Sequence, residues 1–242
     1  MDPENWKQYE ARAEEWRKKC AEGQGDVLNA PDIAPKGAQT PKPPETTPFN
    51  IDEARREYSR WTQTLDEPYR SALRYYNDNT DYIQEARLTG SPFGYSPSKD
   101  AIVYSLNHPE FADYDFRQAN THELGHRLDA LSEIPSWQDE LFLIGLTQAQ
   151  EYVKNNIDTI TVYLANDRQR SDYLDDMLNA LGVPEQYVLA GHEASYWTDT
   201  TRAAEVFANL FSMGAYRATD MNEVKRWFPD LYNSFLHRME GV

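Results

Sequence analysis

Residues 121–129 read THELGHRLD, and the spacing of three residues in this stretch carries the first prediction. Residues four apart on a helix lie about 40° from each other, so His122 and His126 can both reach one metal ion. Glu123 follows His122 directly and would flank the metal, where its carboxylate can act as a general base toward water. This HExxH pattern predicts a metal site. The alternative is a pair of exposed helix histidines beside a solvated glutamate.

The residues around the motif favour the metal site, because they place the motif on a helix that packs against a core. We expect this helix over about residues 117–131, with the histidines near the edge of its apolar side. The apolar positions that recur at helical spacing are Ala119, Leu124, Leu128 and Leu131. Gly125 costs about 1 kcal/mol relative to alanine inside a helix. Its presence indicates that another segment of the chain approaches closely.

A catalytic zinc site takes three protein ligands and leaves one position open for water. The strongest candidate for the third ligand is Glu205, in the segment RAAEVFANLFS (residues 202–212). It is the only acidic residue from Arg202 to Arg217, and small and apolar neighbours suit close helix packing. The alternative is a glutamate that faces solvent.

Other residues are weaker candidates for the third ligand. Asp129 lies one turn beyond His126, but one straight helix rarely supplies three tetrahedral ligands. His108 and His192 fall in expected loops and stay open as candidates. We expect His237, near the C-terminal end, to be a surface histidine.

THELGHRLD, a downstream loop with tyrosine (EASYWT, residues 193–198) and AEVFANLF (residues 204–211) together resemble the gluzincin metallopeptidases. Within that group the chain is most similar to the lethal-factor-like peptidase domains associated with phages and bacterial toxins. The resemblance covers roughly residues 100–240. It implies an α+β, zincin-like fold in which a small twisted sheet supports the HExxH helix and a glutamate-bearing helix packs across it.

The resemblance also implies roles for individual residues. His122, His126 and Glu205 resemble the ligands of one Zn²⁺ ion, Glu123 the general base, and Tyr196 the tyrosine that assists at the scissile carbonyl. His192, in the same loop as Tyr196, is a competing donor. The chain departs from the family at Trp197, where a glycine is usual, and at Asn209, where relatives often carry an acid.

Two polar residues are candidates to orient the metal ligands, since a metal-bound imidazole usually donates its other N–H to an acceptor. Asn209 lies one helical turn after Glu205 and shares its face. We expect its side-chain oxygen to accept the N–H of His122; the alternative is an asparagine that faces water. Asp129, one turn beyond His126, is the second candidate.

The segment AIVYSL (residues 101–106) has the best strand pattern in the chain. It precedes the HExxH helix closely and is a candidate sheet edge, to which a substrate peptide can add a strand. We therefore expect a substrate cleft lined by Ile102, Val103, Tyr104, Ser105 and Leu106. The alternative is a core strand without substrate contact.

Composition narrows the classes of partner. The net charge is −16, which disfavours binding to nucleic acid and to anionic membrane surfaces. The single cysteine, Cys20, excludes an intrachain disulfide and a cysteine-based zinc knuckle. No apolar run approaches the roughly 20 residues that span a bilayer, and the N-terminal residues lack a signal-peptide pattern. These features leave localisation and oligomeric state open.

Composition also divides the chain near residue 49. Residues 1–48 are expected to form a short charged helix, from Trp6 to Cys20, and a proline-rich linker or arm. Residues 49–242 are expected to form one mostly helical domain with a small sheet. Residues 81–100, broken by glycines and prolines, are expected to be irregular. Residues 156–164 can be a strand or a helix extension.

The leading functional hypothesis is a zinc-dependent endopeptidase that acts on a protein or peptide substrate. The alternative is a zinc-stabilised structural or interaction module without turnover, such as a phage-associated domain. Glu123 favours the peptidase, because a purely structural site does not need a carboxylate beside an open metal position.

Overall fold

The computed structural model describes residues 49–84, 91–111, 114–167, 170–216 and 218–240. The helix and proline-rich arm expected within residues 1–48 lie outside the described residues. The described chain is mostly helical and contains a small three-stranded mixed sheet, as expected for an α+β protein. Among these residues, none of the helices combines the length and the apolar character that a membrane crossing requires.

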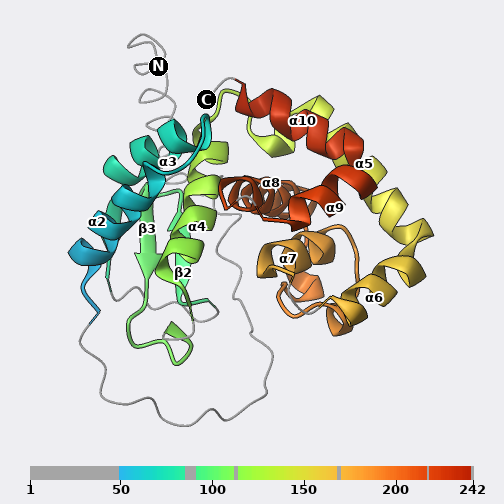
Figure 1. The fold of residues 1–242 in the computed structure, drawn as a ribbon, viewed down its shortest axis with the longest axis horizontal. Helices are drawn as coiled ribbons and strands as arrows, with labels where there is room; N and C mark the ends of the chain where they lie inside the picture. The colour runs from blue at the N-terminus through green and yellow to red at the C-terminus, as the bar shows by residue number, and fades with distance from the viewer. Residues whose placement is uncertain (1–48, 85–90, 112–113, 168–169, 217, 241–242) are drawn as a thin grey trace.

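The elements follow one another along the chain as shown in Figure 1. The first half comprises α2 (Ile51–Thr62), α3 (Tyr69–Asp78), β1 (Asp81–Ile83), β2 (Phe93–Ser96), β3 (Ala101–Tyr104) and α4 (Phe116–Leu131). The second half comprises α5 (Glu140–Asn155), α6 (Ile157–Asn166), α7 (Asp172–Ala180), α8 (Asp199–Ala215), α9 (Asp220–Trp227) and α10 (Pro229–Met239). Short 3₁₀ turns occupy Ser136–Gln138, Glu185–Tyr187 and Ala194–Tyr196.

The sheet has the strand order β1-β3-β2, with β1 parallel and β2 antiparallel to β3. In β3, Ile102 pairs with Tyr82 of β1 on one side and with Tyr95 of β2 on the other. The prediction that residues 102–106 form an exposed sheet edge is therefore wrong, because β3 is the central strand and all four of its residues are buried. Within the described residues, β1 and β2 are the outer strands of this sheet.

Helix α4, which carries the HExxH motif, is surrounded by other elements. Asp115 caps its N-terminus by accepting hydrogen bonds from two backbone amides, those of Arg117 and Gln118. From Asn120 to Leu131 every residue except His122 is buried, although many of them are polar. A helix that is buried on nearly all sides needs polar partners as well as apolar ones.

Those polar partners come from the elements on either side of α4. Arg127 makes a two-pronged ion pair with Asp100, at 2.7 and 2.8 Å, and Tyr95 of β2 donates to the same carboxylate. Tyr58 of α2 bonds the hydroxyl of Thr121 at 2.9 Å. These contacts fix α4 against the sheet and against α2, so the positions of its two histidines are set by the whole N-terminal half.

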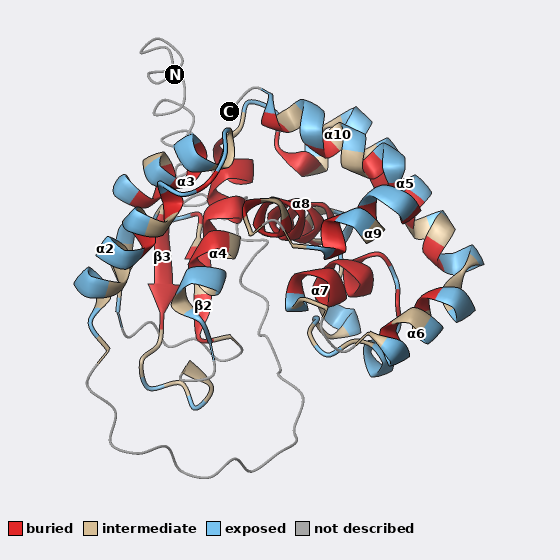
Figure 2. Ribbon diagram, viewed as in Figure 1, coloured by how far each residue is buried: buried red, intermediate tan, exposed pale blue. Residues whose placement is uncertain are grey.

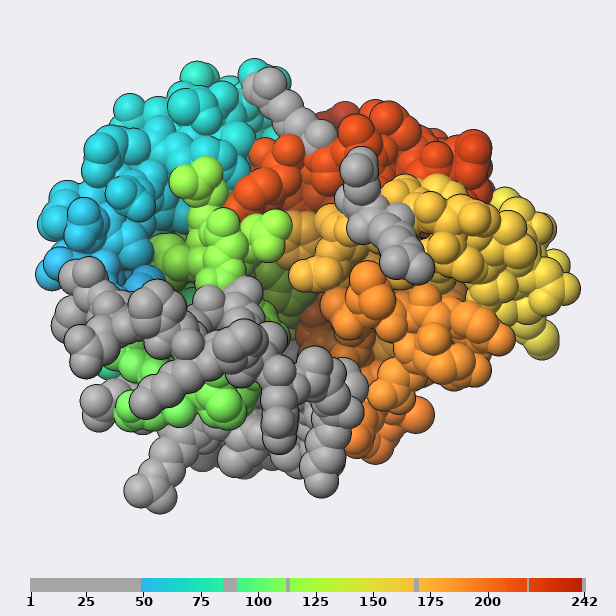
Figure 3. All heavy atoms as spheres, turned by 60° about the horizontal axis from the view of Figure 1, so that its bottom comes forward, coloured from blue at the N-terminus to red at the C-terminus, as the bar shows by residue number. Residues whose placement is uncertain are grey.

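Helix α8 forms the centre of the molecule, where Figure 1 views it nearly end-on, and it packs against both α4 and α7. Figure 2 shows both central helices as largely buried. A capping box between Thr198 and Thr201 starts α8. In the space-filling view, the blue-green N-terminal elements and the orange-red C-terminal ones lie on opposite sides of the molecule (Figure 3).

The helix expected over about residues 117–131 is confirmed as α4, and the described part of residues 49–242 is mostly helical, as expected. Of the ambiguous residues 156–164, Asn156 is the N-cap of α6 and the rest lie within that helix. Residues 81–100 differ from the expectation of irregular structure, since they contain β1 and β2. These strands are only three and four residues long, and pairing with β3 rather than local composition determines them.

Candidate metal centre

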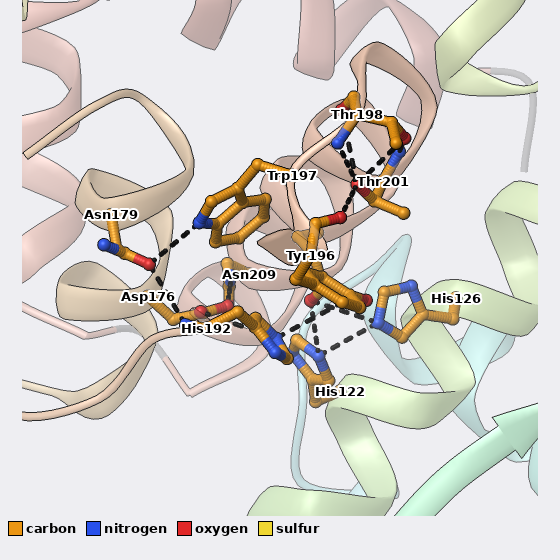
Figure 4. A network of polar contacts seen from close by, with 11 residues as sticks. His122, His126, Asp176, Asn179, His192, Tyr196, Trp197, Thr198, Thr201 and Asn209 are labelled. Atoms are coloured by element: carbon orange, nitrogen blue, oxygen red, sulfur yellow. Dashed lines mark hydrogen bonds and ion pairs between the residues drawn. The ribbon is translucent and has the colours of Figure 1, made fainter. Parts of the chain in front are cut away.

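The structure brings His122 and His126 of α4 together with Glu205 of α8 where these two helices cross. Figure 4 shows the two histidine rings side by side. The two Nε2 atoms lie 3.0 Å apart. Oε2 of Glu205 lies 3.2 Å from Nε2 of His122 and 3.3 Å from Nε2 of His126. Three atoms with lone pairs thus converge on one point, and such a group can hold a metal ion.

The spacing of these three atoms fits a tetrahedral zinc ion. Imidazole nitrogens and carboxylate oxygens bind zinc at about 2.0–2.2 Å, so tetrahedral ligands lie about 3.3–3.6 Å from each other. The observed separations of 3.0–3.3 Å are close to that range. Glu205 and His126 are buried, whereas His122 is partly exposed, which leaves one side of the group open.

Small residues allow α4 and α8 to come close enough for this convergence. A Cβ atom at Gly125 would lie 3.1 Å from Cα of Ala208 and 3.2 Å from the ring of Phe211. Gly125 lies one residue before His126, and Ala208 lies three residues after Glu205. The expectation that Gly125 permits close approach of another segment is confirmed.

His126 and Glu205 stabilise each other's charged forms. Burial disfavours a charged imidazole, but the carboxylate of Glu205 outweighs it and raises the pKa of His126 to about 9. Burial likewise disfavours the charged form of Glu205, but the rings of His126 and His122 hold its pKa well below the usual range. The metal-free group therefore resembles a buried ion pair in which a proton occupies the place of a cation.

Glu123 lies beside this group, one residue from His122 and buried. Burial raises the pKa of Glu123, while the two histidines and a hydrogen bond with the backbone of Tyr95 oppose the shift. A carboxylate whose pKa is raised toward neutrality is suited to accept and return a proton. The contact with Tyr95 also shows that β2, rather than β3, is the strand next to this carboxylate.

Tyr196 reaches the site from the loop before α8. Its hydroxyl donates to Oε1 of Glu205 at 2.5 Å, and its ring stacks on the ring of His192 with 3.9 Å between centroids. Nε2 of His192 lies 3.7 Å from Oε1 of Glu205 and 3.7 Å from Oδ1 of Asp176. Both donors that the sequence suggested for this loop therefore lie next to Glu205.

Asn179 of α7 fixes this loop in place. Its Oδ1 atom accepts hydrogen bonds from the backbone N–H of His192 at 3.0 Å and from Nε1 of Trp197 at 3.2 Å. Trp197, which stands where the resembled family usually has a glycine, therefore has a structural role here. Trp197 anchors the loop to α7 through its indole N–H.

The structure corrects the role expected of Asn209. Its amide donates from Nδ2 to Oδ2 of Asp176 at 2.6 Å, and its Oδ1 atom accepts no hydrogen bond from the described residues. It therefore does not accept the N–H of His122. Asn209 lies one helical turn after Glu205 as predicted, but its side chain points toward Asp176 of α7 and not toward His122.

Asp129 also has partners other than those expected. Oδ1 accepts hydrogen bonds from the backbone of Ser136 and from Arg238, and Oδ2 accepts one from the Ser136 hydroxyl. Nδ1 of His126 has no hydrogen-bond partner within the described chain. Asp129 therefore links the end of α4 to α10 and orients neither histidine.

The remaining histidines lie elsewhere, and one acidic residue was missed. Among the described residues His108 is not part of any group of potential metal ligands, and His237 has an exposed ring near Glu240. Sequence reasoning did not identify Asp176, because α7 carries three aspartates and nothing in the local sequence distinguishes Asp176 from Asp172 and Asp175.

Comparison of this chain with protein-family models, with curated proteins and with solved structures finds no match.

Proposed function

We propose that this protein is a zinc-dependent endopeptidase. The observation that carries the proposal is the convergence of His122, His126 and Glu205 at tetrahedral spacing with the buried carboxylate of Glu123 beside them. The resemblance of residues 121–129 and 193–211 to gluzincin peptidases supports the same conclusion. When bound, Zn²⁺ supplies a Lewis acid that polarises a carbonyl and lowers the pKa of water.

The residues of this chain would divide the remaining work. Glu123 accepts a proton from the attacking water and returns it to the leaving amine, for which its raised pKa is suitable. Tyr196 donates its hydroxyl hydrogen to the substrate carbonyl oxygen as negative charge develops there. This requires Tyr196 to exchange its present acceptor, Glu205, for the substrate.

The edge of β2 is the proposed place for the substrate backbone. Among the described residues β2 is an outer strand of the sheet, it packs against α4, and the backbone of Tyr95 on this strand interacts with Glu123. An extended peptide that pairs with β2 would place a backbone carbonyl near that carboxylate. A substrate peptide with N-methylated amides beside the scissile bond is expected to bind at least 10-fold more weakly than the same peptide without N-methylation. Equal affinity of these two peptides would contradict strand pairing.

A proteome-derived peptide library tests the activity itself. Wild-type protein loaded with Zn²⁺ is expected to produce a reproducible set of new peptide termini. Glu123→Gln should retain the metal, because Glu123 is not among the predicted ligands, and should lower cleavage by at least about 1,000-fold, since the general base is lost. Bound zinc without cleavage by the wild type would instead favour a zinc-stabilised module without turnover.

A further inference from the structure

A second group of potential metal ligands adjoins the first. Asp176 of α7, His192 of the following loop and Glu205 of α8 offer ligand atoms that all lie within 4.8 Å of one another. Figure 4 shows Asp176 and His192 on the side of the site away from His126. Neither residue is needed by the proposed peptidase reaction.

Glu205 belongs to both groups because its two oxygens face different neighbours. Oε2 lies 3.2 and 3.3 Å from the Nε2 atoms of His122 and His126. Oε1 lies 3.7 Å from Nε2 of His192 and accepts the hydroxyl hydrogen of Tyr196. A carboxylate in this arrangement can bridge two neighbouring cations, as carboxylates do in sites with two metals.

Asp176 presents one oxygen with no donor to stabilise it. Its Oδ2 atom accepts a hydrogen bond from Asn209, which fixes the carboxylate. Its Oδ1 atom is buried, has no hydrogen-bond partner in the described part of the chain, and points toward His192 at 3.7 Å. A buried carboxylate oxygen without a donor is costly, and a bound cation would remove that cost.

His192 is held in a fixed position by contacts that leave its Nε2 atom directed at the two carboxylates. Asn179 accepts the backbone N–H of His192, and the imidazole ring stacks on Tyr196 with an interplanar angle of 18°. The side chain is 20% exposed, so the group can be reached from solvent. These contacts hold the imidazole of His192 in place beside the two carboxylates. The three side chains come from α7, from the loop that follows it and from α8.

We propose that Asp176, His192 and Glu205 bind a second divalent transition-metal cation next to the first, with Glu205 shared between them. This inference rests on the metal centre proposed above. Two carboxylates and one imidazole suit Zn²⁺ or Mn²⁺. The second cation binds more weakly than the first, because it competes with the hydrogen bond from Tyr196 to Oε1.

Equilibrium dialysis of the chelator-treated protein against increasing free Zn²⁺, with elemental analysis of both compartments, tests the inference. The expected result is two steps, one equivalent at low free zinc and a second at higher concentration. Tyr196→Phe removes the competing hydrogen bond and should strengthen only the second step, by about 5-fold if that bond is worth about 1 kcal/mol.

Asp176→Asn and His192→Gln should each abolish the second step and leave the first. Asp172→Asn, an exposed position one turn earlier on α7, is the matched control and should keep both steps. Circular dichroism identifies any variant that fails to fold. The second cation site is overturned if the wild type binds a single equivalent of zinc, or if the second step survives in both Asp176→Asn and His192→Gln. Neither result contradicts the first metal centre. No zinc binding at all overturns the first centre as well.

Discussion

Glu205 is the residue on which the candidate site depends most. The side chain of Glu205 is 4% exposed, and its carboxylate contacts two histidines through one oxygen and Tyr196 through the other. A buried carboxylate of this kind is stable only while positive charge or hydrogen-bond donors surround it. Substitutions of the residues around Glu205 are therefore expected to change what the site binds.

Tyr196 is expected to act in turnover and not in metal retention. Tyr196→Phe should leave the fold and the first equivalent of zinc intact, because the tyrosine is not one of the three convergent ligands. Loss of a donor to the developing oxyanion costs about 2.7–4 kcal/mol, so kcat should fall about 100-fold or more. If the variant cleaves as fast as the wild type while Glu123→Gln is inactive, Tyr196 is a packing residue and His192 is the next donor to test.

Metal binding should release a proton from His126. Its pKa in the metal-free protein is raised to about 9, above the ordinary 6.5, so at pH 7 the ring carries a proton that a metal must displace. The affinity for Zn²⁺ should therefore rise as the pH increases from 7 to 9. Isothermal titration calorimetry at pH 7 in buffers of different ionisation enthalpy measures the released protons. Identical heats in all buffers would contradict this prediction.

At the scale of secondary structure elements, the crossing of α4 and α8 positions the site. Gly125 and Ala208 are in close contact at this crossing, and all three convergent ligands lie within one turn of them. A displacement of a few tenths of an ångström between the helices changes the distance from Glu205 to both histidines at once.

Gly125→Ala should weaken metal binding more than it weakens the fold. The new methyl group would lie 3.1 Å from Cα of Ala208 and would push α8 away, while alanine adds about 1 kcal/mol of helix propensity. We expect zinc affinity to fall about 10-fold with a small change in unfolding free energy.

Gly145→Ala is the matched control for that prediction. Its methyl group would lie 2.8 Å from Cα of Leu231, where α5 packs on α10, away from the metal ligands. It should destabilise the fold by about 1–3 kcal/mol and leave zinc affinity unchanged. Chemical denaturation and chelator competition measure the two effects. Equal zinc affinity in both variants and the wild type would mean that the crossing does not control the site.

The sequence predicts the helices of this protein better than its sheet or its polar contacts. Helices depend on local sequence signals, and the one expected over about residues 117–131 is observed as α4, Phe116–Leu131. The two short strands, β1 and β2, depend on a partner distant in sequence, so local composition did not reveal them.

In the candidate site, too, the features that depend on local sequence were predicted and those that depend on distant partners were not. The spacing of His122 and His126 is a property of one helix, and Glu205 stood out as an isolated acid on an apolar helix. The partners of Asn209 and Asp129 depend on how α7 and α10 pack, which the sequence did not disclose.

At the scale of the whole molecule, Arg238 connects the last helix to the end of α4. It donates to Asp129 and to Asp139, both at 2.7 Å, and also to the carbonyl oxygen of Ile134. The Asp129 side chain is fully buried, and that of Arg238 is 8% exposed. The C-terminal end of the chain thereby fixes the helix that carries the HExxH motif.

Arg238→Ala should destabilise the protein by about 3–5 kcal/mol, because it leaves the buried carboxylate of Asp129 without its ion-pair partner. Arg70→Ala is the control. Arg70 pairs with Glu67 on the surface, and its loss should cost no more than about 1 kcal/mol. Urea denaturation monitored by circular dichroism measures both. A similar small effect for the two variants would show that the Arg238 contacts do not hold the halves together.

The most direct test of the proposed centre is a crystal structure of the zinc-loaded protein with anomalous diffraction measured at the zinc absorption edge. We expect an anomalous peak at the α4–α8 crossing, about 2.0–2.2 Å from Nε2 of His122, from Nε2 of His126 and from a carboxylate oxygen of Glu205. A zinc peak more than about 5 Å from Glu205, or no peak at the crossing in protein dialysed against zinc, would contradict the assignment.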